Sequence, residues 1–418
     1  MHVVAAFAGS RGDVQPGIAL AVELRRRGHS VTMAVPPNLV DLVRAAGVDA
    51  APCGIDTAAL LRSDTVTREL RTRNPLRRMR AVAQIARSGD RRAMDDLRAT
   101  VSGADVLVAG SVGQERALAV AEAHGLPLVP VHLCPLRRNR TVPLMSPPGH
   151  DLPAPLVAAS WALLEQALWQ TSRQDENRLR AAVGLPTAHR PTATRITARG
   201  TPEVQAYDPE LFPGLGDEWG ERRPVVGFLS VDTATADALG DRSADTDLDD
   251  WIDSGPAPVY VGFGSMSVAD PDRLRAAVLD GTAGHRVLLA SGWGGVFTAA
   301  DGDDRVRVVP AVDHASVLPR CVAAVHHGGA GTTAAALRAG VPAVVCWLGA
   351  DQPMWGRALR RAGVGVSHRL STLTPALLTD ALDRVCDPDT RLRADSLRRR
   401  LISPQAAVGH AADIVGSA

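Results

Sequence analysis

The chain has 418 residues, too many for a single hydrophobic core and about right for two domains. Its formal net charge is +1 at pH 7 with the two signs interspersed, so the composition gives no general attraction to nucleic acid or to an acidic membrane surface. All 46 basic residues are arginine, and the lack of lysine excludes both a Walker-type phosphate loop and a pyridoxal Schiff base.

Short apolar strands alternate with amphipathic helical segments in the first half of the chain. The expected strands span residues 3–7, 30–35, 48–51, 106–109 and 128–131, with helices at 18–27, 39–46 and 115–124. This alternation predicts a parallel, doubly wound sheet. An arginine-rich insertion at 56–100 and a proline-rich loop at 135–155 are placed where the loops of such a sheet commonly carry binding specificity.

The first strand runs into Gly9-Ser10-Arg11-Gly12-Asp13, which puts Asp13 at the strand end, just before the first helix. A carboxylate there is placed to act as general base, and removing a hydroxyl proton during attack accelerates a reaction typically by about 10² to 10⁴. The same carboxylate also suits a cap on a helix that starts near Gln15. His132 and the run Arg137-Arg138-Asn139-Arg140 border this side of the domain, and we assign them no role.

A segment rich in glycine, proline and acidic residues separates the two halves and predicts a linker at 225–257. Strands resume after it at 259–262, 286–290, 306–309, 323–326, 341–345 and 364–367, with helices between them. We therefore expect an N-terminal Rossmann-like domain at 1–224, a second one at 258–400 and a final helix within 401–418.

The five cysteines are widely spaced and form neither a zinc motif nor a disulfide framework, which predicts a cytoplasmic protein. The apolar run at the N-terminus is short and lacks a preceding basic region, so we interpret it as a strand and not as a signal peptide. No uncharged apolar stretch approaches the roughly 20 residues that span a bilayer, so we expect no stable membrane insertion.

The run His326-His327-Gly328-Gly329-Ala330-Gly331-Thr332-Thr333 closes one apolar segment and opens a helix-like one. Backbone N–H groups at a helix start lack intrahelical acceptors and carry partial positive charge, and glycines let a phosphate approach them. We expect a diphosphate on the N–H groups of Gly329, Ala330, Gly331 and Thr332, with the Thr332 hydroxyl and His326 as further donors. A core histidine satisfied by a backbone carbonyl is the alternative, and for His327 both interpretations stay open.

The run Gly349-Ala350-Asp351-Gln352-Pro353 follows the next apolar segment, and neighbouring parallel strands end at the same edge of a sheet. We expect Asp351 and Gln352 to hydrogen-bond the hydroxyls of an attached sugar, although Asp351 also suits a helix cap. Ser265 is expected to add a hydroxyl to the phosphates, and Trp293 either lines the donor pocket or packs.

Taken in order, the N-terminal signature, the glycine run 262–266, the paired-histidine loop and the Asp-Gln pair resemble the family-1 (GT-B) nucleotide-sugar-dependent glycosyltransferases. The closest resemblance is to the bacterial enzymes that glycosylate antibiotics, macrolides and lipids, and it extends from residue 1 to about 412. It implies two Rossmann-like domains with parallel sheets facing across a cleft, the first for the acceptor and the second for the donor. It also implies a C-terminal helix crossing back to the first domain.

The same resemblance implies that Asp13 is the general base and that Val309, Ala311 and Val312 border the nucleoside. The stacking tryptophan of plant relatives is missing, which leaves uridine and thymidine open. We expect an inverting transfer of a hexose or deoxyhexose from a UDP- or dTDP-sugar to a hydroxyl of a hydrophobic natural product. No Asp-x-Asp motif follows a donor strand, so we expect neither a metal nor another cofactor.

Three other functions remain open from the sequence. The chain resembles enzymes that act on a lipid or sterol, and a nucleotide-sugar 2-epimerase has a related architecture. A non-catalytic protein that binds a nucleotide sugar is the third. A 2-epimerase needs no cavity for an acceptor. The insertions of the first domain, in which we expect acceptor specificity, therefore favour sugar transfer over epimerisation.

Overall fold

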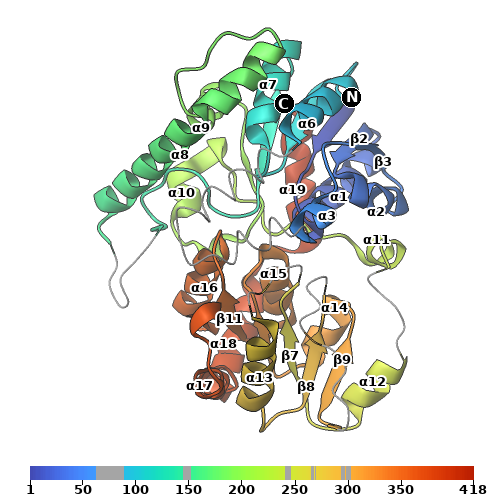
Figure 1. The fold of residues 1–418 in the computed structure, drawn as a ribbon, viewed down its shortest axis with the longest axis vertical. Helices are drawn as coiled ribbons and strands as arrows, with labels where there is room; N and C mark the ends of the chain where they lie inside the picture. The colour runs from blue at the N-terminus through green and yellow to red at the C-terminus, as the bar shows by residue number, and fades with distance from the viewer. Residues whose placement is uncertain are drawn as a thin grey trace. The chain divides into compact units, whose positions relative to one another are not determined.

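The computed structural model describes residues 1–62, 89–144, 152–240, 246–264, 268, 270–292, 297 and 303–418. The chain forms two compact units (Figure 1). Unit 1 comprises Met1–Ala238 and Ile402–Ala418, and unit 2 comprises Leu239–Leu401. The division after Ala238 falls inside the range 225–257 in which we expect a linker.

Unit 1 contains a parallel six-stranded sheet in the order β3-β2-β1-β4-β5-β6. Its strands are β1 (His2–Ala6), β2 (Ser30–Val35), β3 (Asp49–Pro52), β4 (Val106–Ala109), β5 (Leu128–His132) and β6 (Val204–Gln205). The register pairs Val3 with Val31 on one side and with Val106 on the other. Every residue of β4 and β5 is buried, as expected for strands that are covered on both faces.

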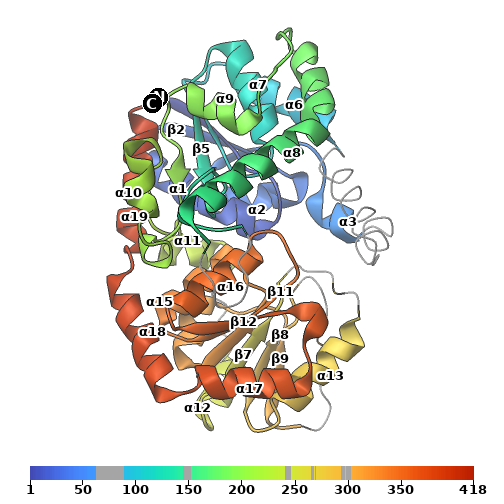
Figure 2. The same ribbon diagram turned by 90° about the vertical axis from the view of Figure 1, so that its left-hand side faces the viewer.

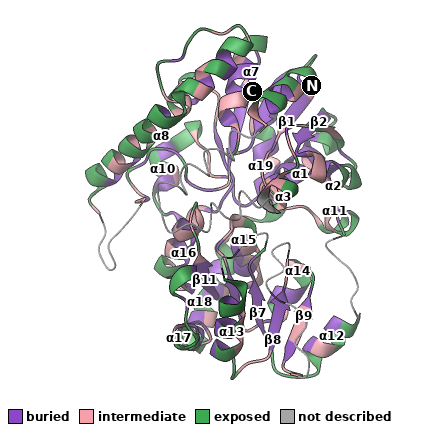
Figure 3. Cartoon of the chain, in the orientation of Figure 1, coloured by how far each residue is buried: buried purple, intermediate pink, exposed green. Residues whose placement is uncertain are grey.

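The helices of unit 1 surround this sheet, and Figure 3 shows exposed outer faces on helices around the buried strands. They are α1 (Arg11–Arg26), α2 (Val40–Ala45), α3 (Thr57–Arg62), α6 (Asp90–Thr100), α7 (Gln114–His124), α8 (Ala154–Ala182), α9 (Thr192–Ala198), α10 (Leu215–Trp219), α11 (Thr233–Ala238) and α19 (Pro404–Gly416), with short 3-10 turns at Pro37–Leu39, Pro209–Leu211 and Gly220–Arg222.

The last helix, α19, packs against α1 within unit 1, and both helices are labelled in Figure 2. Arg27, which follows α1, donates from Nη1 to the Asp413 carboxylate at 2.5 Å and from Nη2 to the Gly409 carbonyl at 3.0 Å. Ala407, Ala411 and Val415 are fully buried. A buried apolar stripe at helical spacing therefore joins the C-terminal segment to the first unit.

Unit 2 repeats the architecture, with a parallel sheet in the order β12-β11-β10-β7-β8-β9. Its strands are β7 (Val259–Gly262), β8 (Val287–Ala290), β9 (Val306–Val309), β10 (Ala323–His326), β11 (Ala343–Trp347) and β12 (Gly365–Arg369). Its helices are α12 (Thr246–Asp253), α13 (Pro271–Gly281), α14 (His314–Val317), α15 (Ala330–Ala339), α16 (Gln352–Arg361), α17 (Pro375–Val385) and α18 (Pro388–Arg400), with 3-10 turns at Leu318–Arg320 and Leu370–Thr372.

The strands of unit 2 alternate between two apolar cores, one on each face of the sheet. Val287 and Leu289 of β8 belong to one core, whereas Leu288 and Ala290 belong to the other. Successive side chains of a strand point to opposite faces, so a sheet with a core on each side needs apolar residues throughout. The predicted α/β class with two parallel, doubly wound sheets is confirmed. None of the described helices has the length and apolar character needed to cross a bilayer.

Candidate active site

The loops that follow β10 and β11 lie against each other in unit 2. The strands pair in parallel, with His326 opposite Val345, so their carboxyl ends meet at one edge of the sheet. Gly328 has a φ of +88°, and a Cβ there would lie 2.6 Å from Val345 Cγ1 and 3.2 Å from the Gln352 carbonyl oxygen. Only glycine fits this contact, which brings the paired-histidine loop to the start of α16.

Helix α15 begins without a side-chain cap. Its N-cap is Gly329, and its first intrahelical hydrogen bond runs from the Thr333 N–H to the Gly329 carbonyl at 3.0 Å. The N–H groups of Ala330, Gly331 and Thr332 precede that bond and have no acceptor within the helix. Gly331 is exposed, and a Cβ on it would meet no atom within 4 Å. The N–H groups at the start of α15, to which we assign the diphosphate, are therefore not covered by a capping side chain.

His326, the last residue of β10, is fully buried. Its Nδ1 accepts the Gly328 N–H at 3.0 Å, so the ring carries its proton on Nε2, and Nε2 has no hydrogen-bond partner. Burial, together with the neighbouring histidines, lowers the pKa of His326 to about 3. The ring is therefore neutral at pH 7 and offers a hydrogen-bond donor but no positive charge.

His327 is half-buried and packs between two glycines. A Cβ would lie 2.5 Å from its Nε2 if placed on Gly329, and 3.1 Å from its Cε1 if placed on Gly264. Burial lowers the pKa of His327 to about 4, opposed by a hydrogen bond with the Gly262 backbone. The ring connects the turn after β7 to the start of α15, and its Nδ1 is buried without a partner.

Thr333 follows Thr332, the last residue that we predict to bind the diphosphate, and the structure adds it as a candidate. Its Oγ1 is buried and has no hydrogen-bond partner. Seven buried side-chain polar atoms of the described residues lack a partner, and His326 Nε2, His327 Nδ1 and Thr333 Oγ1 are three of them. Because buried polar groups are normally satisfied, three such atoms on the short segment from the end of β10 to the first turn of α15 indicate a place for a polar ligand.

Asp351 and Gln352 are oriented by the loop that they follow. Asp351 is the N-cap residue of α16 but makes no capping hydrogen bond with its side chain, and its Oδ2 accepts the Trp355 indole N–H at 2.9 Å. Gln352 Oε1 accepts the N–H groups of Leu348 at 2.8 Å and Gly349 at 3.3 Å. Both side chains thus stand in fixed orientations beside the Gly328 turn.

The residues assigned to the nucleoside lie in three different environments. Val309 ends β9, is buried, and accepts with its carbonyl from the Ser291 N–H and hydroxyl at 3.0 and 3.1 Å. Ala311 is exposed, whereas Val312 is half-buried and packs against an apolar core. Ser265 and Trp293 lie outside the described residues, as do 63–88 of the arginine-rich insertion and 145–151 of the proline-rich loop.

Asp13 in unit 1 stands in the first turn of α1, which corrects the expectation that it precedes the helix. The helix begins at Arg11, and Asp13 Oδ2 accepts from the Ser10 N–H at 2.7 Å and the Ser10 hydroxyl at 2.8 Å. Gly9 has a φ of +115°, and a Cβ there would lie 2.4 Å from Oδ2. Burial raises the pKa of Asp13 above its ordinary value, while the Ser10 hydrogen bonds lower it. A raised pKa is what a general base near neutral pH requires.

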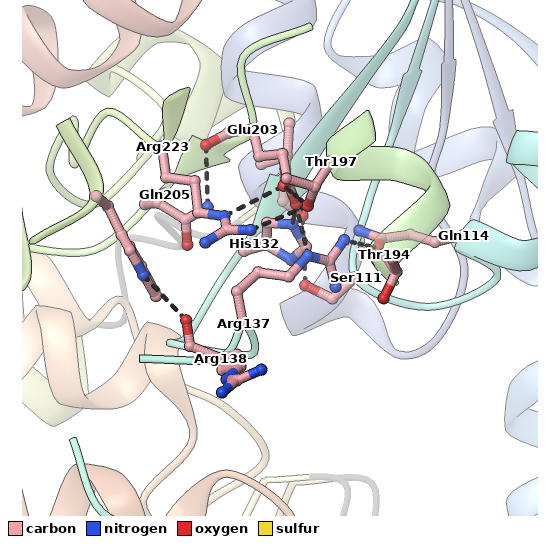
Figure 4. A network of polar contacts seen from close by, with 12 residues as sticks. Ser111, Gln114, His132, Arg137, Arg138, Thr194, Thr197, Glu203, Gln205 and Arg223 are labelled. Carbon is pink, nitrogen blue, oxygen red and sulfur yellow. Dashed lines mark hydrogen bonds and ion pairs between the residues drawn. The ribbon is translucent and has the colours of Figure 1, made fainter. Parts of the chain in front are cut away.

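A buried network of charged groups lies at the carboxyl end of β5 (Figure 4). Glu203 is its centre: Oε2 bonds with His132 Nε2 at 3.1 Å and Arg137 Nε at 2.5 Å, and Oε1 accepts from Arg223 Nε at 3.2 Å. Burial and Arg137 lower the pKa of His132 to about 4. His132 is therefore a neutral member of this network, and Glu203 and Arg223 were not predicted as its partners.

Among the described residues, no three or more His, Cys, Asp and Glu side chains are grouped so that they would hold a metal ion. All five cysteines are free thiols.

Comparisons with known proteins agree with this architecture. Residues 3–143 match the glycosyltransferase family 28 N-terminal domain, and 298–415 match the C-terminal domain of the erythromycin biosynthesis protein CIII-like family. An uncharacterized glycosyltransferase of Mycobacterium tuberculosis is 38% identical, with 100% of this chain and 99% of the relative covered.

Two solved structures share the fold over the whole chain. The glycotransferase of kitacinnamycin gives a TM-score of 0.72 at 20% identity, covering 100% of this chain and 98% of its own. The glycosyltransferase VinC, solved in complex with dTDP, gives 0.64 at 21% identity, covering 100% of both chains.

Proposed function

The chain belongs to the GT-B glycosyltransferases, and we propose on that basis that it transfers a hexose or deoxyhexose from a UDP- or dTDP-sugar, with inversion, to a hydroxyl of a hydrophobic small molecule. We assign the acceptor to antibiotic-type specialised metabolism, and we place the reaction in the cytoplasm because all five cysteines are free thiols. The observation that carries the proposal is the uncapped start of α15 with its unpartnered buried donors.

The donor diphosphate is assigned to that helix start. The N-terminus of a helix carries roughly half a positive charge, and free N–H groups bind anionic oxygens. His326 adds a neutral Nε2–H and Thr333 a hydroxyl, both buried and both lacking a partner. The dTDP complex of VinC supports a nucleoside diphosphate as the bound group.

The sugar is assigned to Asp351 and Gln352. Their side chains are held by the Trp355 indole and by the Leu348 and Gly349 N–H groups, so both have fixed orientations. Carboxylate and amide groups at fixed positions recognise vicinal hydroxyls through hydrogen bonds.

In the proposed reaction, Asp13 accepts the proton of the acceptor hydroxyl as its oxygen attacks the anomeric carbon. A new C–O bond forms as the bond from that carbon to the diphosphate oxygen breaks on the opposite face. The nucleoside diphosphate leaves with the bonding electrons, and the helix start stabilises the charge that it gains.

We test this assignment by calorimetry and thermal denaturation with UDP, dTDP, GDP and CMP. UDP or dTDP is expected to bind in the micromolar range and to raise the melting temperature, since a ligand that binds only the folded state stabilises it by about 2.7 kcal/mol at 100 Kd. Release of free sugar from the matching UDP- or dTDP-sugar then measures the reactivity of the bound donor. No binding of either diphosphate would refute the donor assignment.

The reaction is expected to persist after exhaustive EDTA treatment. Charge on the leaving diphosphate must be neutralised by a divalent ion or by a helix terminus with side-chain donors, and we assign that role to α15, His326 and Thr333. Turnover with and without EDTA, and after adding Mg²⁺ or Mn²⁺, measures this directly. Stimulation is expected to stay within several-fold. Loss of activity that only a divalent ion restores would contradict the assignment.

A further inference from the structure

The loop that follows β5, residues 133–144, is held in one conformation by side chains on both sides. Within it, Asn139 Oδ1 accepts the N–H groups of Thr141 at 3.1 Å and Val142 at 2.6 Å. Outside it, Trp161 Nε1 donates to the Val142 carbonyl at 2.8 Å, and Trp219 Nε1 donates to the Arg138 carbonyl at 3.3 Å. These bonds fix the direction of the backbone through the middle of the loop.

Arg137 anchors the same loop in the interior. It is 7% exposed, and it donates to Glu203 Oε2 at 2.5 Å and to Gln114 Oε1 at 2.8 Å. Glu203, only 1% exposed, also accepts from the Thr197 hydroxyl at 2.8 Å. Buried ions lose their hydration and are tolerated only where partners are placed well, so this network specifies one loop geometry and penalises others.

The fixed backbone presents every second side chain outward. Pro135, Arg137 and Asn139 are buried, while Arg138 and Arg140 are exposed, as is Leu136. Figure 4 shows the Arg138 side chain pointing away from the buried network. The Arg138 guanidinium has no partner among the described residues.

The surroundings of the two exposed arginines differ. The carboxylate of Glu218 accepts the Arg140 N–H and the Thr141 hydroxyl, both at 2.8 Å, so a negative charge lies beside Arg140. Near Arg138, the neighbour that contacts the backbone is the neutral Trp219. Among the described residues, no carboxylate contacts either the backbone or the guanidinium of Arg138.

Arg138 shares an edge of the sheet with Asp13. Only β4 separates β1 from β5, all three strands are parallel, and Asp13 and Arg138 both follow carboxyl ends. With strands about 4.8 Å apart, the ends of β1 and β5 are separated by about 10 Å, and Asp13 and Arg138 lie seven and six residues beyond them. In α/β sheets this edge is where ligands bind.

We propose that Arg138 selects acceptors that carry an anionic oxyacid group at the end opposite to the hydroxyl that is glycosylated, with Leu136 contacting the apolar body between them. The inference rests on the proposed function, because it takes Asp13 as the base. A planar guanidinium binds a carboxylate or phosphate through two parallel hydrogen bonds, and a fixed backbone reduces the entropy lost on binding.

The test uses 6-hydroxy-2-naphthoate and its methyl ester, which differ in the charge at one end and share the hydroxyl at the other. Binding of each to the full chain with saturating UDP or dTDP is measured by calorimetry at low ionic strength. The wild type is expected to bind the carboxylate about tenfold tighter than the ester, and Arg138→Gln to bind both alike. Arg138→Lys is expected to keep part of the preference, since it retains charge and loses the planar fork.

Two matched variants distinguish an effect specific to Arg138 from the effect of removing any one positive charge. Arg140→Gln removes the same charge from the same loop, and we expect it to keep most of the preference because the Glu218 carboxylate lies against the Arg140 backbone N–H. Arg91→Gln on α6 changes an exposed arginine elsewhere in unit 1 and is expected to keep all of it. The inference is overturned if the wild type fails to prefer or to bind the carboxylate, or if Arg138→Gln keeps the preference.

Sugar transfer to the naphthol hydroxyl is measured in parallel, and it separates this inference from the proposed function. A carboxylate preference that depends on Arg138, without transfer from any UDP- or dTDP-sugar, supports the anion site and counts against the transferase reaction. Transfer to both probes at equal kcat/KM, with no effect of Arg138→Gln, supports the reaction and overturns the anion site.

Discussion

The substitution Asp13→Asn is expected to lower turnover by about 10² or more and to leave the affinity for UDP and dTDP unchanged. Asparagine keeps the shape of the side chain, and its carbonyl oxygen can still accept the Ser10 N–H that Oδ2 accepts at 2.7 Å. The start of α1 therefore stays formed, and only the proton acceptor is lost. Turnover at saturating donor and acceptor, with calorimetry of UDP and dTDP, measures the two effects separately.

The pH dependence supplies a second measure of the same residue. Burial raises the pKa of Asp13, and a base works only when deprotonated, so kcat/KM is expected to fall as the pH drops through that raised pKa. Ser10→Ala removes one of the hydrogen bonds that lower the pKa and should move this acidic limb to higher pH. A loss of less than about tenfold in Asp13→Asn would assign the proton transfer to another group.

Several strands follow from the sequence with correct bounds. The predicted ranges 106–109, 259–262, 306–309 and 323–326 coincide with β4, β7, β9 and β10. Most residues in these runs are Val, Leu or Ala, and each run ends at a glycine or histidine or just before a glycine or proline. The apolar pattern and the residues that mark a strand end therefore agree. Strand β11 begins at Ala343, two residues later than predicted, because an apolar run does not mark where ladder pairing starts.

The start of α1 shows where local signals misled the prediction. The predicted helix 18–27 starts seven residues too late, because α1 spans Arg11–Arg26 and includes Gly12, Pro16 and Gly17, which have low helix propensity. Tertiary contact explains Gly17, since a Cβ there would lie 2.7 Å from the Phe7 ring. The signal that was available is Ser10 three residues before Asp13, a pair that marks a helix N-terminus.

The loop between β10 and α15 and the buried network around Glu203 differ in how well the sequence predicts them. His326, the glycines and Thr332 are contiguous, so the geometry of a strand followed by a helix suffices to place them. Glu203 and Arg137 meet only because β5 and β6 pair in parallel, with His132 beside Gln205. Such long-range pairing depends on the topology of the sheet, which local patterns do not encode.

The substitution Gly331→Asp is expected to weaken binding of UDP and dTDP by about 10² or more while leaving the protein at least as stable. Gly331 is the second residue of α15, where an aspartate favours the helix dipole by about 0.3–1 kcal/mol and replaces the poor helix former glycine. The new carboxylate would occupy the open space beside the N–H groups assigned to the diphosphate, where it satisfies them itself and repels an anionic ligand.

Gly331→Ala is the matched control, because its Cβ meets no atom within 4 Å and carries no charge. It is expected to bind both diphosphates like the wild type and to melt at a similar or higher temperature. Calorimetry with UDP and dTDP, together with melting temperatures measured without ligand, separates charge from shape. If the aspartate variant binds the diphosphates with unchanged affinity, the leaving group cannot rest on α15, and the glycine loop serves packing alone. If the alanine variant loses binding equally, space and not charge decides the affinity at this helix start.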